Sequence, residues 1–305
     1  MHRPVMLQEL LNELNVETRK VFIDGTAGHG GHARGILERS PGVRMLLVDQ
    51  DDDALEIARV ALQPWASQCV FVRSNFAELE RVAHEHGFKD ADAVLLDLGV
   101  SSGQLDQPER GFSFMSDGPL DMRMDRRAAR TAADVVNTFD RSELVEIMRS
   151  LGEERAAGRV ASAIVREREK EPIETTGRLA DIVARAKGGR RSRIHPATQA
   201  FQAIRMTVNR ELESLESGLD ASLNVLKPGG VISIISFHSL EDRMAKHFLR
   251  DHEGRWESQP EGGRTWRGAT PAVRRLNRRP LRAAEEEVAD NPRARSAKLR
   301  MAERI

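Results

Sequence analysis

Short apolar runs alternate with longer amphipathic stretches over the first hundred residues of the chain. The runs cover residues 21–24, 45–49, 69–72 and 93–98, and a stretch with apolar residues at helical spacing separates each from the next. Strands that are buried on both faces appear as continuous apolar runs, and strands that alternate with helices form parallel sheets. The pattern therefore predicts an α/β fold built around a parallel sheet.

The pattern changes after residue 98. A fifth apolar run, residues 229–237, appears only after a long segment without a strand signal. The periodicity of that segment predicts helices over residues 142–151, 155–169, 176–187 and 196–226. The tail over residues 296–302 predicts an edge strand near the end of the chain.

This segment is far longer than a parallel crossover needs, because a crossover takes little more than one helix. We therefore expect an all-helical subdomain inserted into the α/β domain. The predicted division is a first part of the α/β domain over residues 1–106, a helical insertion over residues 107–208, and a second part over residues 209–305. The insertion is the expected substrate-recognition element.

A glycine-rich segment, residues 25–32, follows the first predicted strand. Gly28, Gly30 and Ala33 fit the dinucleotide fingerprint, and Asp49 ends the second strand where a carboxylate can hold the ribose hydroxyls. Glycines let the backbone approach a ligand closely, and the N–H groups of the next helix then face that ligand. The segment predicts an adenosine-containing cofactor. A nicotinamide-dependent oxidoreductase would share these features.

Carboxylates stand at the ends of three predicted strands: Asp24, Asp49 and Asp97. Ligands of parallel α/β sheets bind at this edge. A pyrophosphate gains nothing from carboxylates, whereas S-adenosylmethionine carries an ammonium and a sulfonium and no phosphate. The three aspartates therefore favour S-adenosylmethionine. The alternative is that they only cap turns and helices.

Composition narrows the function classes further. The formal net charge is zero, and the single cysteine, Cys69, excludes a disulfide framework and a cysteine metal cluster. Cys69 lies in an apolar run, which predicts a structural thiol. The sequence has no signal-peptide pattern and no 18-residue apolar run, so we expect a soluble cytoplasmic protein. The spacing of the histidines does not fit a metal site, so no metal is expected.

Arginine-rich clusters recur despite the zero net charge. Flexible segments of this kind suit phosphate backbones, and the alternative is a solvated surface balanced by the acidic run at residues 285–287. A non-catalytic RNA-binding protein would share this feature. The three clusters are Arg185, Lys187, Arg190, Arg191 and Arg193; Arg274, Arg275, Arg278, Arg279 and Arg282; and Arg293, Arg295, Lys298 and Arg300.

Two loops and one helix start supply further polar candidates. The loop after residue 97 begins where the fourth strand ends, and residues 110–125 predict an ordered loop that either lines the site or packs a domain junction. The helix start follows the fifth strand, where Ser239 is the expected cap. The candidate side chains are Ser101, Ser102, Gln104, Asp121, Asp125 and His238.

With these motifs in place, the chain resembles the bacterial 16S rRNA (cytosine-N4)-methyltransferases of the RsmH/MraW family. The resemblance extends over nearly the whole length. Gly103 departs from it where the family often has proline, and Ala27 where it often has a bulkier residue. The matching motifs cover residues 24–32, 97–106, 109–114, 117–125, 195–205, 236–243 and 291–300.

The resemblance implies a class I S-adenosylmethionine-dependent methyltransferase (Rossmann-like) sheet with the helical insertion. It implies methylation of the exocyclic N4 of a cytidine in the decoding region of 16S rRNA of the small ribosomal subunit, and it leaves a homodimer open. No catalytic residue can be carried over. The cofactor contacts carried over are Gly30, Gly31, His32, Asp49, Phe76, Asp97 and Gln104.

Overall fold

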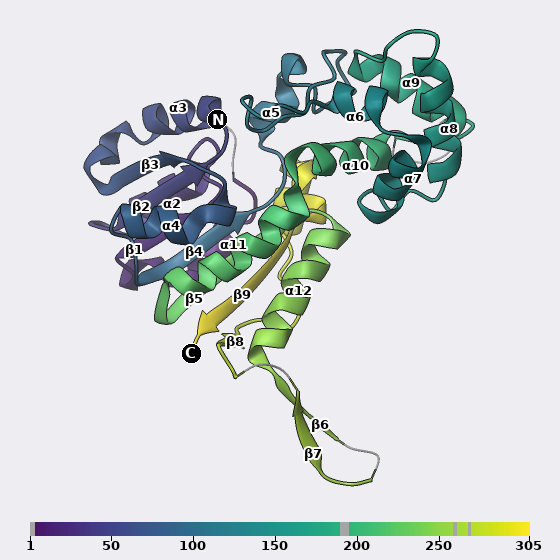
Figure 1. Cartoon of the computed structure of the whole chain (residues 1–305). Coiled ribbons are helices and arrows are strands. Elements are labelled where there is room, and N and C mark those ends of the chain that lie inside the picture. Colours follow the sequence, from purple (N-terminus) through teal and green to yellow (C-terminus); the bar gives the residue numbers. More distant parts are fainter. Residues whose placement is uncertain (1–3, 190–194, 259–260, 268–269) are drawn as a thin grey trace. The chain divides into compact units, whose positions relative to one another are not determined.

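The structure is a computed structural model of the 305-residue chain. It describes residues 4–189, 195–258, 261–267 and 270–305 (Figure 1). The basic residues Arg190, Arg191 and Arg193 of the first cluster therefore lie outside the described residues. The chain divides into two compact units, residues 1–99 with 213–305 and residues 100–212.

The first unit is built on a seven-stranded sheet of order β3-β2-β1-β4-β5-β9-β8. Strands β1 to β5 are parallel, and β9 and β8 run antiparallel to their neighbours. The strands are β1 (Val21–Asp24), β2 (Arg44–Asp49), β3 (Cys69–Arg73), β4 (Ala91–Asp97), β5 (Leu226–Ser236), β8 (Val273–Arg275) and β9 (Lys298–Arg304).

Helices cover both faces of this sheet. Neighbouring strand residues point to opposite sides, so the helices on each face bury a separate set of apolar side chains. Phe22 contributes to a core beneath α1 and α2, and Ile23 contributes to the core beneath α4, α11 and α12. The helices are α1 (Leu7–Leu14), α2 (Gly31–Arg39), α3 (Asp52–Ala61), α4 (Leu79–Glu85), α11 (Glu211–Val225), α12 (Ser239–Glu253) and α13 (Glu285–Asp290), with 3-10 turns η1 (Val16–Thr18), η2 (Gln63–Gln68), η3 (Phe76–Glu78) and η5 (Pro292–Ser296).

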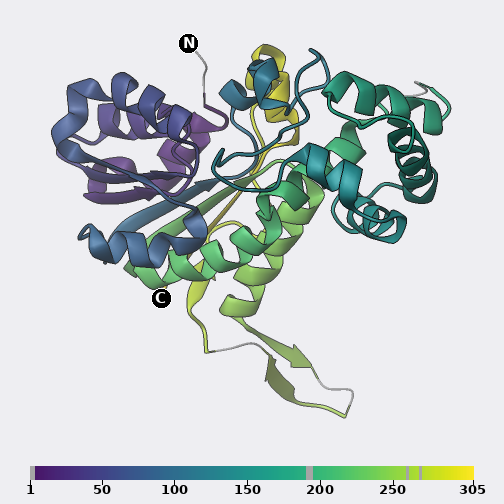
Figure 2. The same ribbon diagram turned by 45° about the horizontal axis from the view of Figure 1, so that its top comes forward.

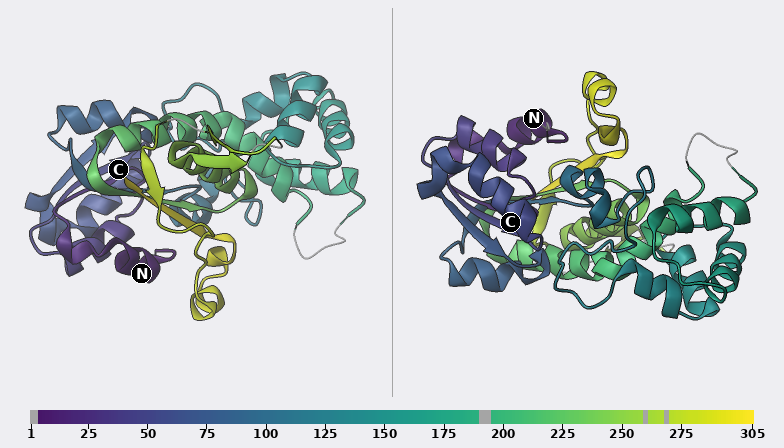
Figure 3. Two further views of the ribbon diagram at one scale, coloured as in Figure 1. Left: turned by 90° about the horizontal axis from the view of Figure 1, so that it is seen from below. Right: turned by 90° about the horizontal axis from the view of Figure 1, so that it is seen from above.

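A hairpin of β6 (Arg255–Ser258) and β7 (Arg264–Arg267) follows α12 and forms its own two-stranded sheet. It extends from the end of α12 away from the main sheet (Figure 2). At the other end of the unit, α13 lies beside the start of the chain (Figure 3). There the Met6 N–H donates to Glu287 Oε1 at 2.8 Å and the Ala284 N–H donates to Glu9 Oε1 at 3.3 Å.

The second unit is helical and has its own core. That core includes Phe112, Leu144, Ile164, Leu179 and Phe201. Capping boxes, in which the first residue and a carboxylate three residues later exchange hydrogen bonds, begin α6 and α7. The helices are α5 (Ser102–Asp106), α6 (Ala132–Thr138), α7 (Arg141–Ser150), α8 (Ala157–Arg168), α9 (Thr176–Ala186) and α10 (Thr198–Asn209), with the 3-10 turn η4 (Pro108–Arg110).

The loop over residues 111–131 is ordered, and it contains residues 111–125 of the segment 110–125 whose composition predicts an ordered loop. The buried Arg110 guanidinium donates to the Arg123 and Met124 carbonyls at 3.1 and 3.2 Å. Gly118 packs so closely on the Pro108 carbonyl that a Cβ at that position would overlap it. These contacts hold the loop within the helical unit.

Three sequence predictions about the elements need correction. The predicted continuous helix over residues 196–226 is interrupted at Arg210, whose φ of 50° is left-handed and ends α10. Its last residue, Leu226, belongs to β5. The final strand is present as β9 but is not an edge strand, because β8 pairs with its outer side.

Candidate cofactor site

Glycines after β1 shape the loop that begins α2. Gly30 has a φ of 77°, which favours glycine, and a Cβ there would lie 3.1 Å from Leu62 Cδ1. Gly31, the first residue of α2, faces Pro4, so a Cβ there would lie 3.0 Å from Pro4 Cγ. The loop has no room for larger residues at these two positions. The N–H groups at the start of α2 can therefore approach a ligand closely.

Asp49 anchors this loop from the end of the neighbouring strand β2. Its Oδ2 accepts a hydrogen bond from the Gly28 N–H at 2.8 Å, and its Oδ1 accepts one from the Asp51 N–H at 2.9 Å. Burial raises the pKa of the Asp49 carboxyl to about 6, and these hydrogen bonds act against that rise. Asp49 thus fixes the glycine loop from the position where a ribose is expected.

Asp24 ends β1 beneath the same loop. The side chain is almost fully buried, with 1% exposure, and its Oδ1 accepts a hydrogen bond from the Thr26 N–H at 3.1 Å. The Thr26 hydroxyl accepts one in turn from the Asp97 N–H at 2.6 Å, which ties β1 to β4. Burial raises the pKa of the Asp24 carboxyl to about 7.

Asp97 ends β4 on the other side of Asp24. Its Oδ2 lies 3.5 Å from His32 Nδ1. Burial raises the pKa of the Asp97 carboxyl to about 8, and the nearby Glu241 adds to the effect. Among the residues that the structure describes, Asp24 Oδ2 and Asp97 Oδ1 are buried without a hydrogen-bond partner. Buried carboxylate oxygens without partners are costly, and a cationic ligand would satisfy them.

Phe76 lies beside this acidic edge, in the 3-10 turn that follows β3. Asn75 caps the turn, and its amide donates to Gln50 Oε1 at 3.0 Å and to Ser214 Oγ at 3.2 Å. The Phe76 ring packs directly on Gly218 of α11, where a Cβ would overlap it. The apolar ring is therefore held next to the ends of the strands.

The close contact gives a prediction for Gly218. Replacement by alanine would force the Phe76 ring to move, because both belong to a packed region with little spare volume. We expect a loss of stability of about 1–3 kcal/mol and weaker binding of S-adenosylmethionine. Thermal unfolding and calorimetric titration of Gly218→Ala measure these effects. Unchanged cofactor affinity would show that the Phe76 ring does not contact the cofactor.

The first unit brings together six of the seven residues that the sequence predicts for the cofactor: Gly30, Gly31, His32, Asp49, Phe76 and Asp97. Gln104 belongs to the helical unit, where it is buried and forms a capping box with Ser101 at the start of α5. Sequence reasoning missed Thr26 and Gly218. A threonine in a turn and a glycine within a helix carry no signal of their own at these positions.

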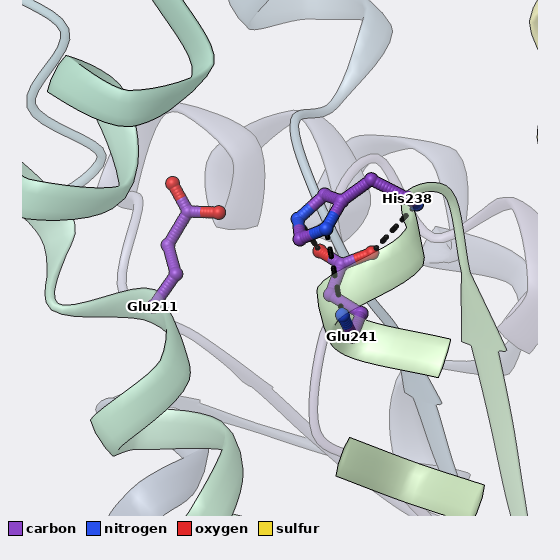
Figure 4. A group of neighbouring side chains, drawn as sticks. All are labelled: Glu211, His238 and Glu241. Atoms are coloured by element: carbon purple, nitrogen blue, oxygen red, sulfur yellow. Dashed lines mark hydrogen bonds and ion pairs between the residues drawn. The ribbon is translucent and has the colours of Figure 1, made fainter. Parts of the chain in front are cut away.

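The start of α12 places His238 beside Glu241 (Figure 4). His238 Nε2 lies 2.9 Å from Glu241 Oε1, and Glu241 Oε2 accepts hydrogen bonds from the Phe237 and His238 N–H groups at 2.9 and 3.3 Å. His238, and not Ser239 as predicted, is the helix cap. The Glu241 carboxylate reaches back to the chain at the end of β5, so the two side chains form one rigid group.

The other polar candidates have defined partners in the helical unit. Asp121 binds the Arg123 guanidinium through both of its oxygens, and Asp125 binds Arg127 in the same way. These ion pairs occupy the two carboxylates that the sequence offers as polar contacts. The side chain of Ser102 lies outside the described residues.

The basic clusters are only partly exposed. Lys187 forms an ion pair with the buried Glu154, and Lys298 and Arg300 share Asp242. Arg274 and Arg275 bind Glu303 and Glu253. Arg278, Arg279, Arg282 and Arg295 of the second and third clusters are exposed.

The raised pKa values predict how the stability of the ligand-free protein depends on pH. Asp24, Asp49 and Asp97 hold protons in the folded state that the unfolded chain, with ordinary carboxyl pKa values, has already lost. Unfolding then releases protons, so the free energy of unfolding falls as pH rises through the folded pKa values. Burial lowers the pKa of His32, which acts in the opposite direction but only below about pH 6.5.

Between about pH 6.5 and 8.5 we therefore expect the free energy of unfolding to fall by at least about 1 kcal/mol. A shift of one pKa unit at one site corresponds to this amount. Denaturant unfolding at a series of pH values measures it. The decrease should be smaller in Asp97→Asn and in protein saturated with S-adenosylmethionine. A wild-type stability that rises across this range would contradict the assignment of buried, protonated carboxyls.

The parallel sheet, the glycine loop and the acidic carboxyl edge together define the α/β fold class of the S-adenosylmethionine-dependent class I methyltransferases (Rossmann-like), as predicted from the sequence. The chain belongs to the MraW methylase family, whose model matches residues 1–305. The methyl donor of this family is S-adenosylmethionine.

Three relatives with the name ribosomal RNA small subunit methyltransferase H are similar over their full length. The protein of a Cyanothece species is 47% identical over 305 residues, which cover 100% of this chain and 95% of the relative. That of Carboxydothermus hydrogenoformans is 47% identical and covers 100% and 98%. That of Geobacter sulfurreducens is 49% identical and covers 100% and 99%.

Within the described part of the chain, no helix combines the length and the apolar character that a membrane span requires.

Proposed function

We propose that the protein transfers the methyl group of S-adenosylmethionine to the exocyclic N4 of a cytidine in the decoding region of 16S rRNA. The substrate would be the small ribosomal subunit in the cytoplasm. Full-length similarity to small-subunit rRNA methyltransferases supports the RNA substrate. The observation that carries the proposal is the group of three carboxylates at the ends of adjacent strands, of which Asp24 and Asp97 each have a buried oxygen without a hydrogen-bond partner among the described residues; such a group suits a cationic cofactor.

In this proposal each part of the cofactor meets a matching group. Asp49 would accept hydrogen bonds from the ribose hydroxyls. Asp24 and Asp97 would offset the positive charges of the ammonium and the sulfonium, and the Phe76 ring would form an apolar wall for the adenine. The start of α2, at Gly31, would present N–H groups to the carboxylate of the cofactor. Gln104 is also a proposed contact of the cofactor, and only the family resemblance supports it.

The proposed reaction is an in-line displacement. The N4–CH3 bond forms as the S–CH3 bond breaks, S-adenosylhomocysteine leaves, and N4 then loses a proton. The N4 lone pair is delocalised into the ring, so the site must orient the amine and accept a hydrogen from it. The target base must also leave its stack. We assign no residue to the role of acceptor.

The RNA backbone would bind to exposed cations. Arg278, Arg279, Arg282 and Arg295 are suited to this role, because their guanidinium groups are exposed. The helical unit is the proposed element for recognition of the surrounding RNA. Lys298 and Arg300 are poor candidates, because Asp242 binds both side chains and Arg300 is buried.

Nucleoside mass spectrometry of small-subunit rRNA tests the proposed substrate. Cells that lack the gene should have no N4-methylcytidine at the decoding-region position, and the wild-type gene should restore it. A gene with Asp49→Ala should not. If the modification is unchanged in the null strain, or if a different nucleoside is lost, the proposed specificity is wrong. A nicotinamide-dependent oxidoreductase would instead bind NAD(P)H, which titration of the purified protein measures.

A further inference from the structure

His32 lies in the first turn of α2 with both ring nitrogens engaged. Nε2 is 2.9 Å from the Val5 carbonyl oxygen and Nδ1 is 3.5 Å from Asp97 Oδ2, and the residue is 6% exposed. A carbonyl oxygen only accepts hydrogen bonds, so Nε2 carries a proton. Burial lowers the pKa of the imidazole, which favours the neutral ring. In the neutral ring, Nδ1 has a lone pair directed at the Asp97 carboxyl.

The contact on the Asp97 side favours a protonated carboxyl. Neutral Nδ1 can accept a hydrogen bond but cannot donate one, so it stabilises the acid form of Asp97 over the carboxylate. Burial and Glu241 act in the same direction on the pKa of Asp97. The other Asp97 oxygen, Oδ1, is buried and has no hydrogen-bond partner among the described residues.

The contact on the other side holds the start of the chain. Val5 precedes Met6, which has a left-handed φ of 56° and whose N–H donates to Glu287 Oε1 of α13. Leu7 packs against Gly35 of α2, where a Cβ would lie 2.8 Å from Leu7 Cδ1. The N-terminal segment, residues 4–14, therefore rests on α2 and α13, and the His32 ring joins it to the acidic edge.

We propose that His32 is a positioning residue that couples the N-terminal segment to the Asp97 carboxyl and so sets the direction and protonation of that carboxyl for the cationic group of the cofactor. The inference rests on the proposed cofactor site. The charged groups that act on the ring are Asp24 at the end of β1 and Glu287 of α13, and Glu241 of α12 acts on the carboxyl; Asp49 at the end of β2 acts on Asp24. When the cofactor binds, the Asp97 proton is released to solvent and the carboxylate meets the cation.

Two isosteric variants separate the roles of the ring nitrogens. His32→Gln places an amide near the position of Nε2, so it can keep the hydrogen bond to Val5 and loses the contact with Asp97. His32→Asn places an amide near Nδ1, so it keeps the contact with Asp97 and loses Val5. His84→Gln, an exposed histidine on α4, is the matched control.

The experiment measures S-adenosylmethionine affinity from about pH 6 to 7.5, together with hydrogen exchange of residues 5–14. Wild-type affinity should rise with pH, because the ligand binds the ionised Asp97. His32→Gln should bind about ten-fold more tightly than wild type at pH 6, because loss of the hydrogen bond to the acid form favours the ionised Asp97, and its affinity should rise less with pH while the N-terminal segment keeps slow exchange. His32→Asn should keep the wild-type pH dependence and exchange faster at residues 5–14.

Thermal unfolding shows whether each variant is folded. The proposal is overturned if both folded variants keep the affinity and pH profile of the control. It is also overturned if both lose affinity equally with the wild-type pH profile, which is the result of a merely structural role. A wild-type protein that fails to bind S-adenosylmethionine would overturn the cofactor assignment itself, and is recognised before any variant is compared.

Discussion

Asp49→Ala is expected to weaken S-adenosylmethionine binding about 100-fold or more and to abolish methyl transfer. The substitution removes the proposed ribose ligand and the two hydrogen bonds that hold the Gly28 and Asp51 N–H groups. Hydrogen bonds to a charged group are worth about 1.5–3 kcal/mol each, and 2.7 kcal/mol is about a hundred-fold in affinity. Calorimetric titration measures the loss directly.

Two further variants control this result. Asp49→Asn keeps one acceptor oxygen and nearly the same volume, so we expect an affinity between those of wild type and Asp49→Ala. Asp53→Ala, an exposed aspartate of α3, should bind as wild type does. If Asp49→Ala binds S-adenosylmethionine as tightly as the wild-type protein does, the cofactor does not bind at the end of β2.

Asp242→Ala is expected to lower the free energy of unfolding by about 3–5 kcal/mol, the cost of removing one partner from a buried ion pair. Asp242 Oδ1 binds Arg300 Nε at 2.7 Å and Oδ2 binds Lys298 Nζ at 2.9 Å. Arg300 is 5% exposed, so its charge would remain buried and uncompensated. These contacts attach α12 to β9. Chemical denaturation monitored by circular dichroism measures the loss.

The matched comparison is Arg295→Ala, which removes an exposed arginine from the same basic cluster. It should change the free energy of unfolding by no more than about 0.5 kcal/mol. If Asp242→Ala and Arg295→Ala are equally stable, the ion pairs of Lys298 and Arg300 with Asp242 do not stabilise the fold. Lys298 and Arg300 would then become candidates for RNA binding.

The parallel part of the sheet could be predicted because its strands are buried on both faces. Such strands must be apolar along their length, and the runs before residue 98 meet this requirement. The hairpin of β6 and β7 could not be predicted in this way, since its residues Arg255 and Arg264 give no apolar run. The break at Arg210 had no signal either. A single left-handed residue between two helices leaves the helical periodicity on both sides intact.

The site was predictable as far as side-chain chemistry marks it. Carboxylates that end predicted parallel strands stand at the edge of the sheet where ligands bind, so the placement of Asp24, Asp49 and Asp97 at one edge could be predicted from the sequence, and their contact with the cofactor stays a prediction. Phe76 was implied only by the family resemblance, because an aromatic residue after a strand is equally suited to the core. The role of Gly218 depends on a contact between distant segments, which no local pattern contains.

A crystal structure of the protein with S-adenosylhomocysteine tests the account most directly. We predict ribose hydroxyls within hydrogen-bond distance of the Asp49 carboxylate, the adenine beside the Phe76 ring, and the amino-acid end of the ligand near Asp24 and Asp97. A ligand bound away from the ends of β1, β2 and β4, or one whose ribose does not contact Asp49, would contradict it.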